Sequence, residues 1–183
     1  MGNPELLETT QTSFNLRFGS YEEARAWIGR KSGAQLCEDG INWPAIKYYC
    51  SLVRDGSPAY WDQSWAHAHC GGLLAPPGML FVWSMALGWR PGQTEPPATL
   101  LATQVPLPGA TLINVSTDSE FLRPVRVGDH LSFEEEVIDV TPEKRTSLGR
   151  GHFVTTRFTY RNQHGEIVAT HTNILYRFGA GRE

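Results

Sequence analysis

The stretch Asp55–Leu87, DGSPAYWDQSWAHAHCGGLLAPPGMLFVWSMAL, decides how this chain folds. It opens with a turn, continues through a Trp-rich segment and a Gly/Pro loop, and ends in Met79–Leu87, which is apolar on every side. This last run is long enough for three helical turns, and a helix without a polar face is buried. The sequence therefore predicts a buried helix that begins after Gly78 and is enclosed by the rest of the chain.

The start of this helix is a candidate site for chemistry. The first amides of a helix have no acceptor within the helix, and the helix dipole favours negative charge beside them. An anion or a polarised carbonyl oxygen is therefore expected near Gly78. The alternative is a glycine that only permits a tight entry into the helix.

Length and composition limit the classes of protein to consider. With 183 residues, of which 40% are hydrophobic, the chain is expected to form a single domain over residues 1–183. In this division, residues 1–40 form an N-terminal extension with a helix, and residues 90–109 form a long Pro/Gly loop that binds or covers something. The net charge of -3 does not indicate a basic surface of the kind that binds nucleic acid.

Cysteine content and hydropathy point to the cytoplasm. Three cysteines without metal-ligand spacing read as reduced thiols. The first 13 residues are polar and lack the apolar centre of a signal peptide, and Met79–Leu87 is far shorter than the ~20 residues of a membrane span. We therefore expect a cytoplasmic protein without a membrane anchor.

Helical signals come before the strand signals. Tyr21–Gly29 and Ala45–Val53 read as helices, with Ser20 and Asn42 as their capping residues. Strand patterns follow at Thr111–Ser116, His130–Val140, Gly151–Asn162 and Glu166–Phe178, with a polar turn at Pro142–Arg145. Helices followed by an antiparallel meander predict an α+β domain, with the sheet wrapped around the buried helix.

Four motifs carry a resemblance to a known family. Asp55–Asp62 (DGSPAYWD) resembles the D-x-N-P-x-H-x-D motif of MaoC-like (R)-specific enoyl-CoA hydratases, and Pro77–Leu80 (PGML) lies at the spacing of that family's H-G-M-L. Phe121–Asp129 (FLRPVRVGD) is similar to its F-x-R-P-V-x-x-G-D turn, and Gly149–Ala169 is similar to its closing hairpin. The resemblance covers Ile41–Phe178 and is greatest to the N-terminal, FAS1-like dehydratase half of the family. It implies the hot-dog fold and hydration of acyl thioesters without metal or organic cofactor.

The departures from the family motifs bear on catalysis. Asp55 matches the catalytic aspartate, whereas Tyr60 stands in place of the histidine, Ser57 in place of the asparagine, and Pro77 in place of the histidine before Gly78. A tyrosine titrates near pH ~10 and is a poor base at neutral pH. In this family, a hot-dog domain that lacks part of the catalytic Asp/His pair is combined with a second hot-dog domain or subunit that has the whole pair. Mycobacterial fatty-acid and steroid side-chain hydratases are built in this way.

These considerations give a set of candidate residues. The catalytic candidates are Asp55, Tyr60 and Gly78, whose N–H is expected to hold the thioester oxygen as it gains charge. The substrate-binding candidates are Ser57, Pro77, Met79, Trp61, Trp83 and Arg123. Several have a simpler reading, namely a turn for Asp55, packing for Tyr60 and the tryptophans, and a solvated or ion-paired role for Arg123. No metal site is expected, because His67 and His69 do not share one helical face.

Several functions remain open on this basis. The first is a subunit that binds an acyl-CoA or acyl-carrier-protein thioester and relies on a second hot-dog subunit with an intact Asp/His pair. The others are a self-sufficient homodimeric hydratase using Asp55, a thioesterase, and a non-catalytic acyl-CoA binding module. The thioesterase is disfavoured because Ser84 is the one polar residue of Met79–Leu87. We also expect a dimer, because pairing would cover an exposed sheet edge.

Overall fold

The computed structural model describes residues 15–87, 89–92, 94 and 100–179. The predicted polar segment at residues 1–13 and residues 93 and 95–99 of the predicted loop lie outside these residues. The described helices are α1 (Tyr21–Arg25), α2 (Trp43–Val53), α3 (Pro58–Trp61), α4 (Gln63–Cys70), the 3-10 turn η1 (Pro77–Met79), α5 (Leu80–Trp83) and α6 (Leu101–Gln104). The strands are β1 (Gln35–Leu36), β2 (Thr111–Phe121), β3 (Ser132–Val140), β4 (Lys144–Thr146), β5 (Gly149–Arg161) and β6 (Ile167–Gly179).

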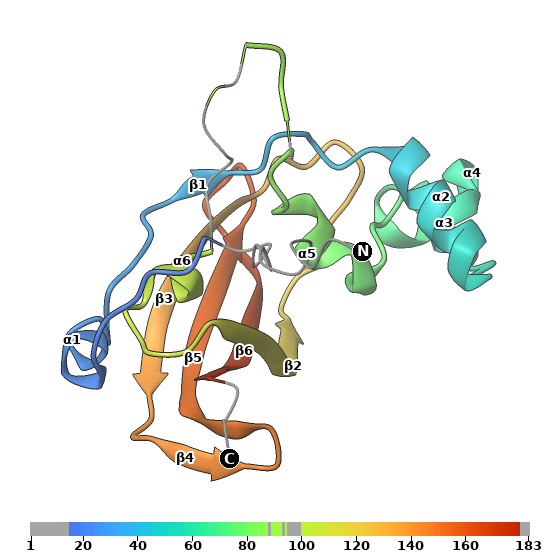
Figure 1. Cartoon of the computed structure of the whole chain (residues 1–183). Coiled ribbons are helices and arrows are strands. Elements are labelled where there is room, and N and C mark those ends of the chain that lie inside the picture. Colours follow the sequence, from blue (N-terminus) through green and yellow to red (C-terminus); the bar gives the residue numbers. More distant parts are fainter. Residues whose placement is uncertain (1–14, 88, 93, 95–99, 180–183) are drawn as a thin grey trace, which may run out of the picture.

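An antiparallel sheet in the order β1-β3-β5-β6-β2 forms the body of the molecule, and β4 pairs with β5. The α+β prediction is confirmed, but the sheet is a meander only from β3 to β6. Strand β2 crosses over to pair with β6, and the predicted turn at Pro142–Arg145 is partly the short strand β4. Helix α5 lies against the sheet, and α2, α3 and α4 gather beyond one end of it (Figure 1).

The predicted helices in the first half have clear local causes. Ser20 and Glu23 form a capping box at the start of α1, and the Asn42 side chain accepts a hydrogen bond from the Ala45 N–H at the start of α2. Helix α2 ends at Val53, and its C-cap residue Arg54 has a left-handed φ of 57°. Helix α1 ends at Arg25 rather than Gly29, and single turns continue the chain to Gly29.

The prediction of one buried helix over Met79–Leu87 is wrong, because the observed helix is shorter. Only Leu80–Trp83 is α-helical, and the Ser84 hydroxyl donates to the Phe81 carbonyl oxygen at the point where the helix ends. Met79, Leu80 and Trp83 are buried against the sheet, whereas Met85 and Leu87 are 60% and 50% exposed. The apolar run therefore packs on the sheet along its first half only.

The core has two parts on the inner face of the sheet. The larger one joins η1 and α5 to α2 and to the strands, through Ile46, Met79, Leu80, Trp83, Leu131, Phe158, Tyr160 and Ala169. The smaller one packs Ala24, Val105 and Leu107 on Val137, Val140 and Val154. Burial of these side chains is the main stabilising contribution to the fold.

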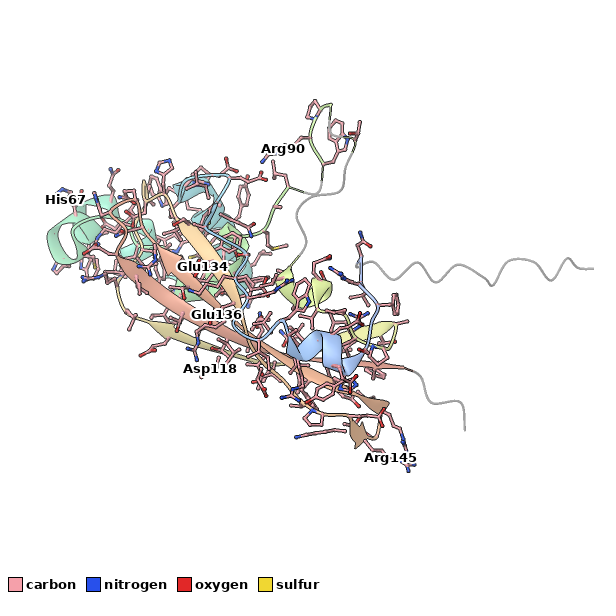
Figure 2. All side chains as sticks on the ribbon, turned by 90° about the vertical axis from the view of Figure 1, so that its left-hand side faces the viewer. His67, Arg90, Asp118, Glu134, Glu136 and Arg145 are labelled. Carbon is pink, nitrogen blue, oxygen red and sulfur yellow. The ribbon has the colours of Figure 1, made fainter. Side chains whose placement is uncertain are left out.

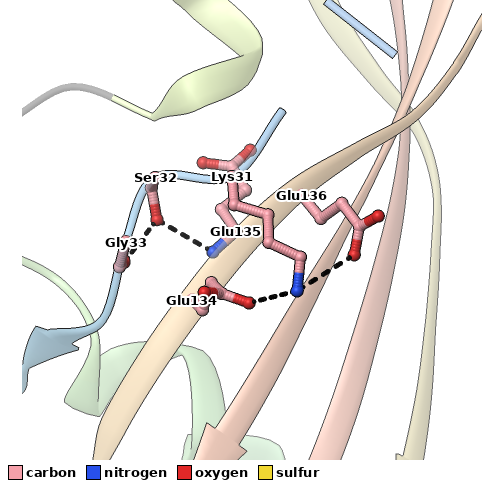
Figure 3. A network of polar contacts seen from close by, with 6 residues as sticks. All are labelled: Lys31, Ser32, Gly33, Glu134, Glu135 and Glu136. Carbon is pink, nitrogen blue, oxygen red and sulfur yellow. Dashed lines mark hydrogen bonds and ion pairs between the residues drawn. The ribbon is translucent and has the colours of Figure 1, made fainter. Parts of the chain in front are cut away.

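Strand β3 shows how alternation places charged residues on both faces of the sheet. Glu134 and Glu136 lie on the outer face, where the Lys31 ammonium is 2.8 Å and 3.8 Å from their carboxylates (Figures 2 and 3). Glu135 points inward and is 2% exposed, and its carboxylate accepts the Leu101 and Ala102 N–H groups at the start of α6. Glu135 therefore holds the end of the long loop against the sheet.

Candidate active site

The Asp55–Asp62 stretch forms a turn at Asp55 followed by two helix caps, Ser57 and Asp62. The Asp55 carboxylate accepts the Ser57 N–H at 3.0 Å, the Ser57 hydroxyl faces the Ala59 N–H at the start of α3, and the Asp62 carboxylate accepts the Trp65 N–H at the start of α4. These are the local bonds that Asp and Ser form at turns and helix starts. Asp55 is exposed, so its carboxylate is open to solvent on its other side.

Backbone hydrogen bonds bring three of the four motifs together. The Leu74 N–H donates to the Ala59 carbonyl oxygen at 3.0 Å, and the Ala75 N–H donates to the Val125 carbonyl oxygen at 2.8 Å. The Val127 N–H donates to the Leu73 carbonyl oxygen at 2.9 Å. The loop before η1 is thus held between α3 and the Phe121–Asp129 turn, and residues far apart in the sequence line one space.

That space is a cavity of about 250 Å³. Its wall combines α3, the loop with η1 and α5, and the Phe121–Asp129 turn, and is mostly apolar. The lining residues are Tyr60, Leu74, Ala75, Pro76, Pro77, Leu80, Trp83, Phe121, Leu122, Arg123, Pro124 and Val125. An apolar cavity with few polar groups is the usual form of a small-molecule site.

The cavity contains four of the nine predicted site residues. Tyr60, Pro77, Trp83 and Arg123 line it. Asp55, Ser57, Trp61, Gly78 and Met79 do not, and each has another place in the fold. The Trp61 indole N–H donates to the Asp55 carbonyl oxygen at 2.7 Å, and Met79 is 2% exposed in the core.

Tyr49, which does not line the cavity, makes a close contact next to Pro77 that the sequence did not reveal. It lies on α2, and a Cβ added to Gly78 would overlap the Tyr49 hydroxyl oxygen and lie 3.2 Å from Tyr49 Cζ. A glycine at position 78 therefore allows a phenol to approach the backbone at the start of the 3-10 turn. No sequence signal marked Tyr49, because contact between α2 and η1 depends on the tertiary fold.

The electrostatics of the site bear on proton transfer. Burial raises the pKa of Tyr60, and the nearby charge of Asp55 adds to the increase. The Tyr60 phenol therefore stays protonated at neutral pH and is a hydrogen-bond donor rather than a base. The Trp83 indole N–H is buried and has no hydrogen-bond partner among the described residues.

The two arginines of the Phe121–Asp129 turn differ in exposure and role. Arg123 is exposed at the rim of the cavity, with its guanidinium 3.6 Å from the Glu166 carboxylate. Arg126 is half-buried and donates from Nε to the Cys70 carbonyl oxygen at 2.9 Å. Arg126 therefore ties α4 to the turn, and Arg123 is the arginine that reaches solvent beside the cavity.

Comparison with protein families gives a match over most of the chain. Residues 26–171 match the family described as the FAS1-like dehydratase domain region.

Within the described part of the chain, every helix is too short or too polar to cross a membrane.

Two curated relatives resemble the chain over most of its length. A probable enoyl-CoA hydratase alpha subunit of Thermomonospora curvata is 38% identical over 160 residues, covering 84% of this chain and 50% of that protein. A 3-oxo-4,17-pregnadiene-20-carboxyl-CoA hydratase alpha subunit of Mycobacterium tuberculosis is 26% identical over 147 residues, covering 79% and 47%. The chain thus spans about half the length of the curated relatives it matches.

Solved structures share the fold. A chain of the ChsH1-ChsH2 complex from Mycobacterium tuberculosis superposes with a TM-score of 0.72 at 25% identity, over 88% of this chain and 93% of that chain. The MaoC-like dehydratase from Rhodospirillum rubrum gives a TM-score of 0.58 at 26% identity, over 84% and 94%. With its helices packed on an antiparallel sheet and its match over residues 26–171, this chain belongs to the FAS1-like dehydratase domain family and has the hot-dog fold of MaoC-like dehydratases.

Proposed function

We propose that this chain is one subunit of a heteromeric MaoC-like enoyl-CoA hydratase, or 3-hydroxyacyl thioester dehydratase, that acts on fatty-acyl or steroid side-chain thioesters. The observation that carries the proposal is the apolar cavity of about 250 Å³, whose wall comes from three of the family motifs. Its aliphatic and aromatic wall suits an acyl chain, because burial of apolar surface favours binding. The names of the curated relatives, both alpha subunits of hydratases, support the same assignment.

The reaction determines which groups the complete site needs. Hydration adds the water oxygen to C3 of a 2-enoyl thioester and a proton to C2, and negative charge develops on the thioester oxygen. A base must take a proton from water, and hydrogen-bond donors must face the developing charge. The reverse reaction removes water from a 3-hydroxyacyl thioester with the same groups.

The residues of this chain fit the donor role better than the base role. Tyr60 keeps its proton at neutral pH, so we assign it as a donor to the thioester or to the bound water. Asp55, which lies near enough to affect the Tyr60 pKa, is assigned as a carboxylate that orients water. The missing base is assigned to a second hot-dog subunit with an intact Asp/His pair.

The rim of the cavity suits the other end of the substrate. Arg123 is exposed there, and its ion pair with Glu166 is long enough for an anion to compete. We assign Arg123 to the phosphates of CoA or of an acyl-carrier-protein arm, which arginine binds through its paired N–H groups. A wholly non-catalytic acyl-CoA binding module would use the same cavity and differs only in lacking activity with a partner.

Binding of dodecanoyl-CoA to the full chain, measured by calorimetry, tests the acyl cavity. Leu122 lines the cavity and is 52% exposed, so Leu122→Trp fills the cavity from its rim without disturbing the core. We expect at least a roughly 10-fold loss of affinity, the equivalent of about 1.4 kcal/mol. Leu148, at the β4–β5 turn and 51% exposed, provides the matched control Leu148→Trp. Equal affinity of the two variants, or no binding to the parent, would contradict the assignment.

A further inference from the structure

Two hydrogen-bonded polar pairs lie together on the inner face of the sheet, which also carries the buried polar residues Glu135 and Thr156. The Ser119 hydroxyl on β2 is 2.8 Å from His171 Nδ1 on β6, and the Thr117 hydroxyl donates to Asn173 Oδ1 at 2.8 Å. His171 and Asn173 are 7% and 5% exposed. A buried polar group without a hydrogen bond destabilises the fold, so such pairs are kept in a core where they bond to each other or to a ligand.

The side chains of these pairs face the same interior as the cavity. The His171 ring is stacked on the Phe81 ring of α5, with centroids 5.4 Å apart, and meets the Phe158 ring edge-on. Burial lowers the pKa of His171, and the Asn173 side chain opposes that change. The imidazole is therefore neutral at neutral pH, able to accept at one nitrogen and donate at the other.

The two pairs follow Phe121 on the same face of the sheet. Phe121 lines the cavity and is paired with Ala169 on β6. Toward the start of β2, the Ser119–His171 pair lies two residues from Phe121, and the Thr117–Asn173 pair lies four residues from it. At about 3.4 Å per residue, these pairs lie roughly 7 Å and 14 Å beyond Phe121. A ligand that entered the cavity and extended along the inner face would meet them in this order.

Ser119 and Thr117, on β2, are the more accessible members of the two pairs. Strand β2 is at the edge of the sheet beside β6 (Figure 1), Ser119 is half-buried, and Thr117 is exposed. The pairs also retain hydrogen-bonding capacity. After its bond to Thr117, Asn173 still has its amide N–H groups, and after the bond to His171 the Ser119 hydroxyl still has a free lone pair.

We propose that Ser119, His171, Thr117 and Asn173 form a polar subsite for a hydroxyl or keto group on the distal part of the acyl chain. The proposal rests on the proposed function and narrows its substrate class to acyl thioesters with a hydrogen-bonding group beyond their first apolar portion. A site of this kind discriminates against an unsubstituted chain, which leaves buried polar groups without a ligand partner.

The test compares acyl-CoAs with and without a terminal hydroxyl group. Octanoyl-, decanoyl-, dodecanoyl- and hexadecanoyl-CoA and their ω-hydroxy forms are titrated into the full chain by calorimetry. One net hydrogen bond is worth about 0.5–1.5 kcal/mol, so the hydroxyl should strengthen binding roughly 2- to 12-fold at one chain length. The gain should disappear in Ser119→Ala or in Thr117→Val, each of which removes one hydroxyl near the strand edge.

Ser116→Ala is the matched control. Ser116 is exposed on the same strand and pairs with Ile174, so it belongs to the opposite face of the sheet. The control should keep the full hydroxyl gain. Tight binding of the unsubstituted chains with no gain at any length, or a gain that survives both Ser119→Ala and Thr117→Val, would overturn the subsite alone. Failure of every acyl-CoA to bind would overturn the proposed function together with it.

Discussion

Gly78→Ala tests the contact that sets the geometry beside the cavity. The φ of Gly78 lies outside the left-handed region, so an alanine fits the backbone, and the obstacle is the Tyr49 hydroxyl that a Cβ would overlap. Overpacking of this kind costs about 1–3 kcal/mol, and the better helical preference of Ala returns about 0.5–1 kcal/mol. We expect a net loss of about 1–2 kcal/mol and a fall in Tm of roughly 2–8 °C.

A double-mutant cycle isolates this contact. In a Tyr49→Phe background the hydroxyl is gone and the nearest ring atom is 3.2 Å from the added Cβ. The cost of Gly78→Ala should then shrink below about 0.5 kcal/mol, giving a coupling of about 1 kcal/mol in urea unfolding. Gly56→Ala is the control, since among the described residues, its two chain neighbours aside, no atom lies within 4 Å of its Cβ position. An equal cost of Gly78→Ala in both backgrounds would refute the role assigned to Tyr49.

Three further predictions concern assembly, catalysis and pH. Because β2 leaves one sheet edge open, the protein should be a dimer, with itself or a partner, in light scattering at micromolar concentration, and a stable monomer would contradict this. Tyr60→His with Ser57→Asn should add measurable enoyl-CoA hydration, within the ~10²–10⁴-fold range of acid–base groups, and a gain that survives Asp55→Asn would exclude Asp55. Burial raises the pKa of Glu135, so its stabilising contribution is present below the ordinary glutamate pKa and is lost as pH rises through the raised value. Urea titrations should therefore show Glu135→Gln gaining stability relative to the parent as pH rises from acid to neutral, and a pH-independent difference would show that the Glu135 pKa is unshifted.

Local rules predicted the elements whose causes are local. Ser20 and Asn42 cap the helices they were expected to cap, and alternation placed Val137 and Phe158 in the core. Strand β1 was missed, because two residues paired with β3 carry no pattern of their own. The place of β2 beside β6 was also missed, since period-2 alternation gives the faces of a strand but not its neighbours.

The apolar run Met79–Leu87 shows why its burial was misjudged. An all-round apolar pattern indicates that a segment is covered, but it does not say whether the cover comes from the same chain. Met85 and Leu87 are exposed here, and the helix ends at Trp83. Of the residues that the sequence proposed for the site, Tyr60, Pro77, Trp83 and Arg123 line the cavity. Leu122 at the cavity and the contact of Tyr49 with Gly78 depend on contacts that only the fold creates.

The hydration rate of crotonyl-CoA tests the central claim most directly. The full chain is assayed alone and after co-expression with a hot-dog subunit that carries an intact D-x-N-P-x-H motif. Because Tyr60 stands in place of the base and its pKa is raised, we predict little or no hydration by the chain alone and clear hydration by the pair. In the pair, Leu122→Trp should reduce the rate and Leu148→Trp should not. Full activity of the purified chain by itself would contradict the claim that it is a half-site dependent on a partner.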